Sequence, residues 1–374
     1  MSTSGVTFVN TEEEKKKFLE FQYDHYKADT YFVPPLRMDQ KKLLSTEKNP
    51  FFNNAEMALF IAEHNGQIAG RISAVVDHRF NEYHGRKTGH FGFFECIDHQ
   101  PTANLLFRVA EDWLKEKGME DVLGPASPGM MDMIGFLVDG FEKDPYILMP
   151  YSKPYYEKLV TAAGYEQEMD LLAFLVDKDN VALDRVERAK QIVFRRNPGL
   201  VIRPVVLKEM DKEVEIIRAI YNDTWKHNWG FLPLTQEELA ATAQDFKMIL
   251  DPDFAHIAEI DGEPVAFSVG IPDLNILFKK MNGNLFPFGI FRLLLGRRKI
   301  KRYRTALMGV LPEVQGRGID ALLHQAAIEK GLGKGYTESE LSWVLGNNHE
   351  MIRTAEKIGA RLDKTYRMYS KKLA

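Results

Sequence analysis

Apolar and polar residues alternate along two parts of the chain, and a two-residue turn interrupts each run. In the first part, ALFIAEH and QIAGRISAVVD lie on either side of Asn65-Gly66 within Ala58–Asp77. An Asn-Gly pair between alternating apolar residues is the strongest short-range signal for a β-hairpin. The pattern therefore predicts a hairpin, followed by another strand at Gly89–Cys96.

Other segments repeat their apolar residues at the spacing of a helix. A helix is predicted from about Pro101 to Gly118, and an earlier one over Thr11–Tyr26 with Thr11 as its cap. A strand is expected just before the helix at Thr11–Tyr26, at Val6–Val9. The inward face of the helix that starts near Pro101 is expected to carry Leu105, Leu106, Val109, Ala110 and Trp113.

The two halves of the chain resemble each other. Ile61–Gly66 (IAEHNG) returns as Ile257–Gly262 (IAEIDG), and the Leu-Leu pair at 105–106 returns at 322–323. A looser third match joins Glu157–Tyr165 with Ala355–Ala360. Chance similarity between hairpins is the alternative, but three markers in the same order favour duplication. We expect a domain at 1–177, a connecting helix or linker at 178–198, and a second domain at 199–374.

Composition excludes several classes of protein. The 374 residues are 45% hydrophobic and 27% charged with a net charge of −4, which gives no global electrostatic argument for binding nucleic acid, DNA included, or membranes. The one cysteine excludes an internal disulfide and a thiolate zinc cluster, and no metal site is predicted. The N-terminus lacks an apolar signal core, and no stretch reaches about 18 apolar residues. We expect a cytoplasmic protein without a transmembrane segment.

A glycine turn joins a predicted strand to a predicted helix in the second half. The strand covers Thr305–Leu311, Pro312 ends it, and Gln315–Gly318 (QGRG) precedes a helix from Ile319. A glycine turn before a helix start presents unpaired N–H groups and the positive end of the helix dipole, which together favour an anion. The alternative is that these glycines serve only close packing.

The fuller pattern Val-x-Pro-x-x-Gln-Gly-x-Gly-Ile resembles the acyl-CoA-binding signature of the GNAT superfamily of N-acetyltransferases. The resemblance implies that acetyl-CoA or another acyl-CoA is the co-substrate. It also implies that Asn348, at the start of the last helix, lies near the pantetheine arm. The cofactor-binding residues it implies at the turn are Val310, Leu311, Gln315, Gly316, Arg317, Gly318, Ile319 and Asp320.

Two positions depart from the family pattern. Asp320 stands where Gly or Ala is usual, and Ala355 stands where a Tyr commonly protonates the departing thiolate. Asp320 would repel a pyrophosphate at close range, unless Arg317 offsets it. We expect instead that its carboxylate caps its own helix and points away from the phosphates.

The resemblance places a catalytic carboxylate on the central strands. Glu340 is the first candidate for the base and Glu313 the second, although a lone strand Glu is often simply solvated. Tyr366 is the candidate acid, with Tyr369 as the other choice; both also fit half-buried strand aromatics.

The whole chain is similar to a bacterial group of tandem GNAT proteins. Phrases that carry this likeness are Pro154–Tyr156, Asn228–Phe231, Asn284–Gly289 and Glu340–Trp343. The implied fold is α/β (α+β), with two tandem domains that each contain a mixed, mostly antiparallel sheet flanked by helices. The first copy reads CIDHQP at Cys96–Pro101, where the turn would lie, so we interpret it as degenerate.

Three further segments have two or more interpretations. Asn284–Arg304 contains seven cationic residues between 292 and 304, and fits a lid over an acyl chain, a membrane-surface segment, a phosphate or RNA patch, or a solvated face. The loop Gly124–Gly140 fits a methionine-rich binding wall or core filling. Trp225–Phe231 fits an acceptor wall or an aromatic plug, with His227 as a weak base candidate.

These features predict an acyl-CoA-dependent N-acyltransferase, with acetyl as the first choice of acyl group and a small-molecule amine as acceptor. Backbone N–H groups of residues 308–311 would hold the tetrahedral oxyanion. An aminoacyl-tRNA-dependent transferase and a non-catalytic binding protein for acyl-CoA or another metabolite are the alternatives. The sequence defines neither the acceptor nor the oligomeric state.

Overall fold

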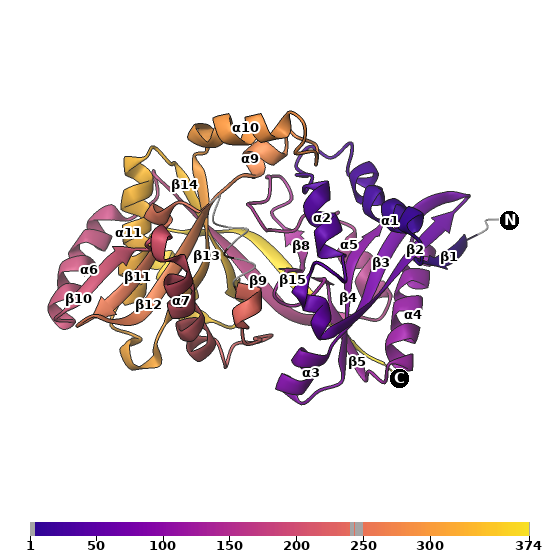
Figure 1. The fold of residues 1–374 in the computed structure, drawn as a ribbon, viewed down its shortest axis with the longest axis horizontal. Coiled ribbons are helices and arrows are strands. Elements are labelled where there is room, and N and C mark those ends of the chain that lie inside the picture. The colour runs from indigo at the N-terminus through magenta and orange to yellow at the C-terminus, as the bar shows by residue number, and fades with distance from the viewer. Residues whose placement is uncertain (1–3, 240–242, 244–249, 374) are drawn as a thin grey trace. The chain divides into compact units, whose positions relative to one another are not determined.

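The computed structural model describes residues 4–239, 243 and 250–373 (Figure 1). Its contacts group the chain into two compact units. The first comprises Met1–Leu171, Leu277–Arg292 and Lys364–Ala374, and the second comprises Leu172–Ile276 and Leu293–Asp363. Strands β9 (Glu166–Asp177) and β15 (Arg361–Lys372) contribute residues to both units. The domain boundaries at 177 and 199 stay predictions.

The first unit contains a mixed sheet in the order β1-β2-β3-β4-β5. Neighbouring strands are antiparallel except for the parallel pair β4 and β5. The last residues of β15 pair with β5, and the residues before them pair with β8. The strands are β1 (Ser4–Phe8), β2 (Ala55–His64), β3 (Gln67–Asp77), β4 (Thr88–Cys96), β5 (Asp121–Gly124), β6 (Ala126–Ser127), β7 (Met133–Ile134) and β8 (Phe136–Asp139).

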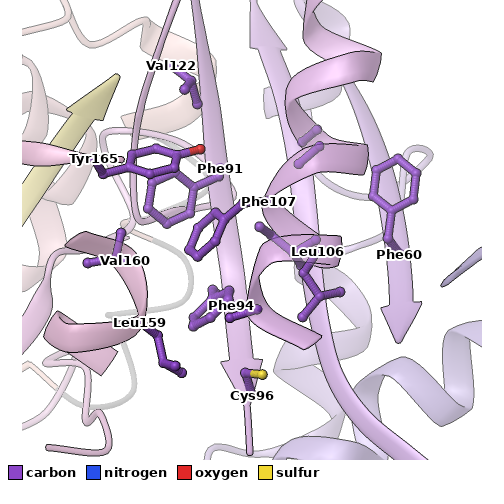
Figure 2. Close-up of a cluster of buried hydrophobic side chains, with 14 of the residues drawn as sticks. Phe60, Phe91, Phe94, Cys96, Leu106, Phe107, Val122, Leu159, Val160 and Tyr165 are labelled. Carbon is purple, nitrogen blue, oxygen red and sulfur yellow. The ribbon is translucent and has the colours of Figure 1, made fainter. Parts of the chain in front are cut away.

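Helices cover both faces of this sheet. Alternate residues of β2 point to opposite faces, and α1 packs on one face while α4 packs on the other. Figure 2 shows the core on the α4 side, where Phe107 stacks on Phe94 and meets Phe91 edge-on. The helices are α1 (Glu12–His25), α2 (Arg37–Leu43), α3 (His78–His84), α4 (Gln100–Glu116) and α5 (Tyr156–Ala162).

The second unit contains a sheet in the order β14-β13-β12-β11-β10. Its neighbours are antiparallel except for the parallel pair β13 and β14. Helices α7 and α11 pack on opposite faces. The strands are β10 (Leu200–Pro204), β11 (Ala255–Ile260), β12 (Glu263–Pro272), β13 (Arg302–Val310) and β14 (Glu338–Leu345); the helices are α6 (Leu183–Arg196), α7 (Met210–Thr224), α11 (Ile319–Gly333) and α12 (His349–Lys357).

Shorter helices complete the described chain. The helices α9 and α10 follow β12, and the boundary between the two units falls within each of them. No helix among the described residues combines the length and the apolar character needed to cross a membrane. The bounds are α9 (Asn275–Phe278), α10 (Gly289–Gly296) and the 3-10 helices Pro50–Asn53, Leu207–Glu209, Pro252–Phe254, Arg297–Lys299 and Pro312–Val314.

The two sheets share one strand order, as the repeat predicts. Each begins with four strands that pair antiparallel in chain order, and the fourth strand then forms one parallel pair with the fifth. The predicted hairpin turns both adopt the left-handed backbone, with φ of 54° and 73° at Asn65-Gly66 and 52° and 88° at Asp261-Gly262. The register also shifts at matching places, between Ala62 and Glu63 and between Ala258 and Glu259. The mixed, mostly antiparallel α/β fold is confirmed.

Candidate functional site

The two central strands of the second unit separate partway along their length. Strand β13 pairs with β14 from Arg302–Glu338 to Thr305–Leu341, yet β13 continues to Val310. On its other side, β13 remains paired with β12 as far as Val310. Beyond Thr305, the edge of β13 that faces β14 is therefore outside the described pairing, and its backbone groups can bind a ligand.

The glycine turn follows directly from this part of β13. The Gln315 side-chain amide donates to the Val310 carbonyl at 2.9 Å, which fixes the turn against the strand end. Gly316 and Gly318 have φ of +72° and +85°, a backbone conformation that glycine adopts at low cost. A Cβ on Gly318 would lie 2.7 Å from Val193 Cγ2 on α6, whereas one on Gly316 would meet nothing within 4 Å. Packing therefore explains Gly318 but not Gly316.

The start of α11 is available to an anion. Gly318 is its N-cap and, in the described structure, no side chain caps this end. Residues 315–317 are exposed, whereas Ile319 is buried in the core beneath them. An uncapped helix start leaves N–H groups without intrahelical partners at the positive end of the dipole. The Arg317 guanidinium donates to the Glu313 carbonyl at 2.8 Å, which keeps a cation beside the turn.

Asp320 lies in the first turn of α11 and contacts another helix. Its Oδ2 accepts a hydrogen bond from Thr354 Oγ1 of α12 at 3.1 Å. One turn further along α11, burial lowers the pKa of His324 to about 4, and the nearby Asp320 carboxylate opposes that shift. The Asp320 side chain thus connects α11 with α12. The sequence predicted only that it would cap its own helix, not this contact between helices.

The start of α12 carries the other predicted cofactor contact. Asn348 caps this helix, because its side-chain oxygen accepts the Met351 N–H at 3.1 Å. Ala355 is 2% exposed and packs in the core with Ile328 and Leu341. Position 355 therefore faces the core, and the alanine there supplies no hydroxyl for a leaving thiolate.

Backbone groups near the end of β13 are only partly available. The Leu311 N–H donates to the Val265 carbonyl at 2.9 Å, so including Leu311 in the predicted oxyanion set is wrong. The Trp225 indole N–H donates to the Met308 carbonyl at 2.9 Å and holds this side chain against β13. Of the predicted aromatic wall, Trp225 is half-buried, Phe231 is buried beside Tyr221, and His227 is exposed.

Glu340 is fully buried on β14, so the alternative interpretation of this residue as a solvated strand carboxylate is wrong, while its role as a base stays a prediction. Its Oε1 accepts a hydrogen bond from Ser342 Oγ at 2.7 Å, and Ser342 Oγ accepts one from Arg304 Nε at 2.8 Å. Glu340 is opposite Arg304 in the parallel register, one residue before the described pairing ends. The alternation of Glu340 and Ser342 was visible in the sequence, but the participation of Arg304 required the register.

Tyr366 belongs to a different unit from the turn. It is fully buried in the part of β15 that lies in the first unit, where its backbone pairs with Leu137. The alternative candidate Tyr369 donates to Glu157 at 3.0 Å, and burial raises its pKa. Both tyrosines are therefore more buried than the half-buried positions expected. The role of Tyr366 as an acid stays a prediction.

The matching junction in the first unit is occupied by its own chain. Strands β4 and β5 pair as far as His90–Leu123, and β4 continues to Cys96. There, the Phe93 N–H donates to Ser127 Oγ at 2.8 Å. The Ala126 carbonyl lies where a Cβ on Gly92 would be. Part of the Gly124–Gly140 loop thus fills this space, in agreement with the packing interpretation.

Comparisons with known proteins agree with this geometry. Residues 214–360 match the model of the Acetyltransferase (GNAT) family. Protein YghO of Escherichia coli (strain K12) is 36% identical over 374 residues, covering 98% of this chain and 95% of that protein. The Bacterial ceramide synthase of Caulobacter vibrioides (strain NA1000 / CB15N) is 35% identical over 373 residues, covering 98% and 96%.

A solved structure matches the fold along the whole chain. The tandem GNAT protein from the clavulanic acid biosynthesis pathway superposes with a TM-score of 0.58, covering 100% of this chain and 99% of that one. Its sequence identity of 11% limits this likeness to the fold. Taken with the two full-length relatives, the family match and the glycine turn show that the chain belongs to the GNAT acetyltransferase family.

Proposed function

We propose that the chain is an acyl-CoA-dependent N-acyltransferase whose acceptor is a long-chain amino alcohol, so that its product is an amide of the ceramide class. One observation carries the acyl-CoA part of the proposal. The exposed, uncapped start of α11 directly follows the turn Gln315–Gly318 at the end of β13. Family membership supports the same co-substrate.

The residues at this junction suit the phosphate groups of an acyl-CoA. N–H groups at Gly316–Asp320 would donate hydrogen bonds to the pyrophosphate oxygens, with the helix dipole and Arg317 adding positive potential. The edge of β13 beyond Thr305 offers backbone partners to an amide-containing arm. Acyl-CoA, when bound, supplies an activated thioester.

The reaction needs one base and no metal-bound intermediate. The acceptor nitrogen attacks the thioester carbon, a C–N bond forms, the C–S bond breaks, and the amine loses a proton. We assign that proton to Glu340, which the hydroxyl of Ser342 orients. The thiolate leaves without a hydroxyl at position 355, which is tolerable because the pKa of a thiol is about 8.5.

The acceptor class rests on a relative. The protein named Bacterial ceramide synthase is similar to this chain over nearly its whole length. A ceramide is the amide of a long-chain amino alcohol and a fatty acid, so its formation is an N-acyl transfer. This relative favours a long acyl group over the acetyl group that the sequence alone suggested.

The test measures product and released CoA together. The full chain is incubated with palmitoyl-CoA or acetyl-CoA and sphinganine, while thiol release is followed with Ellman's reagent and the amide by mass spectrometry. We expect palmitoyl amide and thiol in equal amounts, and faster turnover than with acetyl-CoA. Turnover with acetyl-CoA but not with palmitoyl-CoA would overturn the acyl assignment, and thiol release without an amide of sphinganine would overturn the acceptor assignment.

A second arm separates the remaining alternatives. Binding of CoA without turnover of any amine would support the non-catalytic binding protein. Transfer from a charged tRNA, in the absence of acyl-CoA, would support the aminoacyl-tRNA-dependent transferase. Either result would contradict the proposed reaction.

A further inference from the structure

Large apolar side chains gather on the surface of one short segment. Five of them lie within ten residues, and each is more than half exposed. Single exposed apolar residues are ordinary on a soluble surface, but a contiguous group marks an interaction site. The five are Phe286 (66% exposed), Phe288 (74%), Phe291 (60%), Leu294 (63%) and Leu295 (78%).

The helix in this segment is apolar on the face that is exposed to solvent. Helix α10 covers Gly289–Gly296, and both of these glycines are buried. Phe291, Leu294 and Leu295 follow the i, i+3, i+4 spacing of one face, and all are exposed. If this helix packed only against its own chain, its solvent-exposed face would be expected to carry polar residues. This face therefore fits an apolar phase outside the chain.

Charge is the second, independent feature of the segment. The sequence contains no acidic residue between Asp273 and Glu313. Arg292 donates to the Lys280 carbonyl of its own chain. Two of the seven predicted cations lie away from the surface, since half-buried Arg302 pairs with Asp273 at 2.5 Å and buried Arg304 donates to Ser342. The other five are exposed at the surface: Arg292, Arg297, Arg298, Lys299 and Lys301.

We propose that the segment Phe286–Lys301 binds the surface of an anionic phospholipid bilayer. The phenylalanines and leucines enter the boundary between headgroups and acyl chains, and the cations contact lipid phosphates. Helix α10, with eight residues, is about 12 Å long and lies on the bilayer without crossing it.

The same features disfavour the other occupants. An RNA surface would use the cations but give Leu294 and Leu295 no apolar partner. A second copy of the chain would cover the apolar face but would bring like charges together across a two-fold interface. An anionic bilayer satisfies both features at once.

The inference is independent of the proposed reaction. Together with it, the segment would hold the enzyme at the phase in which long-chain amines and their amides dissolve. Vesicle binding is measured without any substrate. Its failure would leave the N-acyltransferase proposal intact, and failure of the acyltransferase assay would leave this inference intact.

The experiment is vesicle flotation of the full chain with phosphatidylcholine vesicles, or with vesicles in which three in ten lipids are phosphatidylglycerol. We expect binding to the anionic vesicles only, and weaker binding as salt rises. The variant Phe288→Ser/Leu295→Ser should bind at least about tenfold more weakly, because two inserted apolar side chains are removed. Its control, Met38→Ser/Leu362→Ser, removes two half-exposed apolar residues elsewhere and should bind as the wild type does.

The charged half of the segment is tested in the same way. Arg298→Gln/Lys299→Gln should weaken binding by about fivefold for each cation, whereas Lys16→Gln/Lys17→Gln, with the same loss of charge elsewhere, should not. All four variants change exposed residues, so an unchanged melting temperature verifies folding. Absence of vesicle binding, equal binding by the segment and control variants, or binding to tRNA in place of vesicles would overturn the proposal. So would light scattering that shows a dimer which only the segment variants dissociate.

Discussion

The two strand-to-helix junctions share their topology and differ in what occupies them. In each unit, a parallel strand pair follows an antiparallel meander, the pairing stops partway, and a helix starts at the end of the longer strand. In the first unit, Ser127 and Ala126 lie against the strand edge at Gly92 and Phe93. In the second unit, the side chains of Trp225, just after α7, and Gln315 donate to the Met308 and Val310 carbonyls of this part of β13. The same topology thus has a strand edge filled by its own chain in one copy. In the other, which we call the open junction, the edge of β13 beyond Thr305 has no strand partner in the described pairing.

The starts of α4 and α11, the helices that follow the two junctions, also differ in their turn residues. The first junction lacks glycine, and Pro101 in the first turn of α4 has no N–H to offer. The second presents Gly316 and Gly318, each with positive φ, whereas neither α4 nor α11 has a side-chain cap in the described structure. An anion site therefore requires more than the topology, because it needs the turn residues and an unfilled strand edge together.

Buried carboxylates do not distinguish the copies. In the first unit, Glu95 accepts a hydrogen bond from Tyr156 at 2.6 Å and lies 3.8 Å from the Arg71 guanidinium; burial raises its pKa. In the second, Glu340 is buried with Ser342 and Arg304. A buried Arg–Glu group is thus weak evidence for catalysis. Its position next to an open junction is the stronger argument.

The largest expected effect separates these two carboxylates. Glu340→Gln should lower kcat by about 10²–10⁴-fold, because general base catalysis contributes that much, and should leave the Kd for CoA unchanged. The matched variant Glu95→Gln should keep kcat per folded molecule, even if its melting temperature falls. Equal losses of kcat in both variants would remove the functional difference between the copies.

A buried histidine in each unit should make stability depend on pH. Burial lowers the pKa of His90 in β4 and of His324 in α11 to about 4. Because these folded values lie below the unfolded value of about 6.5, each neutral ring contributes stability above pH 6.5 that is lost as the pH falls toward 4. Either replacement by Leu should reduce the loss of unfolding free energy between pH 7.5 and pH 4.5 by about 2–3 kcal/mol.

Denaturant unfolding at both pH values measures this quantity. A two-state transition is required for each variant, so fluorescence and circular dichroism should report the same midpoint. Some pH dependence should survive either replacement, because burial also lowers the pKa of His25 and His256 to about 4. A reduction with one replacement but not with the other would show that the units differ in their cores as well as in their junctions.

The turn itself is tested at Gly316. A carboxylate placed there by Gly316→Asp should weaken CoA binding by roughly five- to a thousandfold, through repulsion of about 1–4 kcal/mol at close range. Gly66→Asp is the matched control, because Gly66 has nearly the same φ (+73° against +72°) and equally open surroundings in the first-unit hairpin. Gly318 is unsuitable, since any Cβ there meets Val193. Titration calorimetry decides, and equal affinity in the two variants would contradict the cofactor assignment.

Features encoded by adjacent residues were predictable from the sequence. The Thr11 capping box with Glu14, the Asn65-Gly66 turn and the glycine turn before α11 all depend on residues a few positions apart. The common strand order also followed, because the repeated hairpins retain their spacing. Local pattern therefore accounts for most of the fold.

Contacts between distant residues could not be predicted in this way. Ser127 on Phe93, Val193 against Gly318, and Arg304 beside Ser342 each join elements that only the folded register brings together. Nothing in their local sequence marks them, because serine, valine and arginine are common in loops, helices and strands. The occupied and open junctions therefore became distinguishable only in the structure.

The smallest expected change in CoA affinity concerns Asp320, the carboxylate in the first turn of α11. If Thr354 holds the Asp320 carboxylate, Asp320→Ala should leave the Kd for CoA within about twofold at low and high salt, and should lower the unfolding free energy by about 1 kcal/mol. Thr354→Val removes the same hydrogen bond without changing charge and should cost about as much, while the double variant should cost less than the sum of both. If the carboxylate instead faces the phosphates, Asp320→Ala alone would tighten CoA binding, most strongly at low salt. Calorimetric titration at two salt concentrations distinguishes these outcomes, and a salt-dependent tightening would show that the second junction tolerates Asp320 only at the expense of affinity.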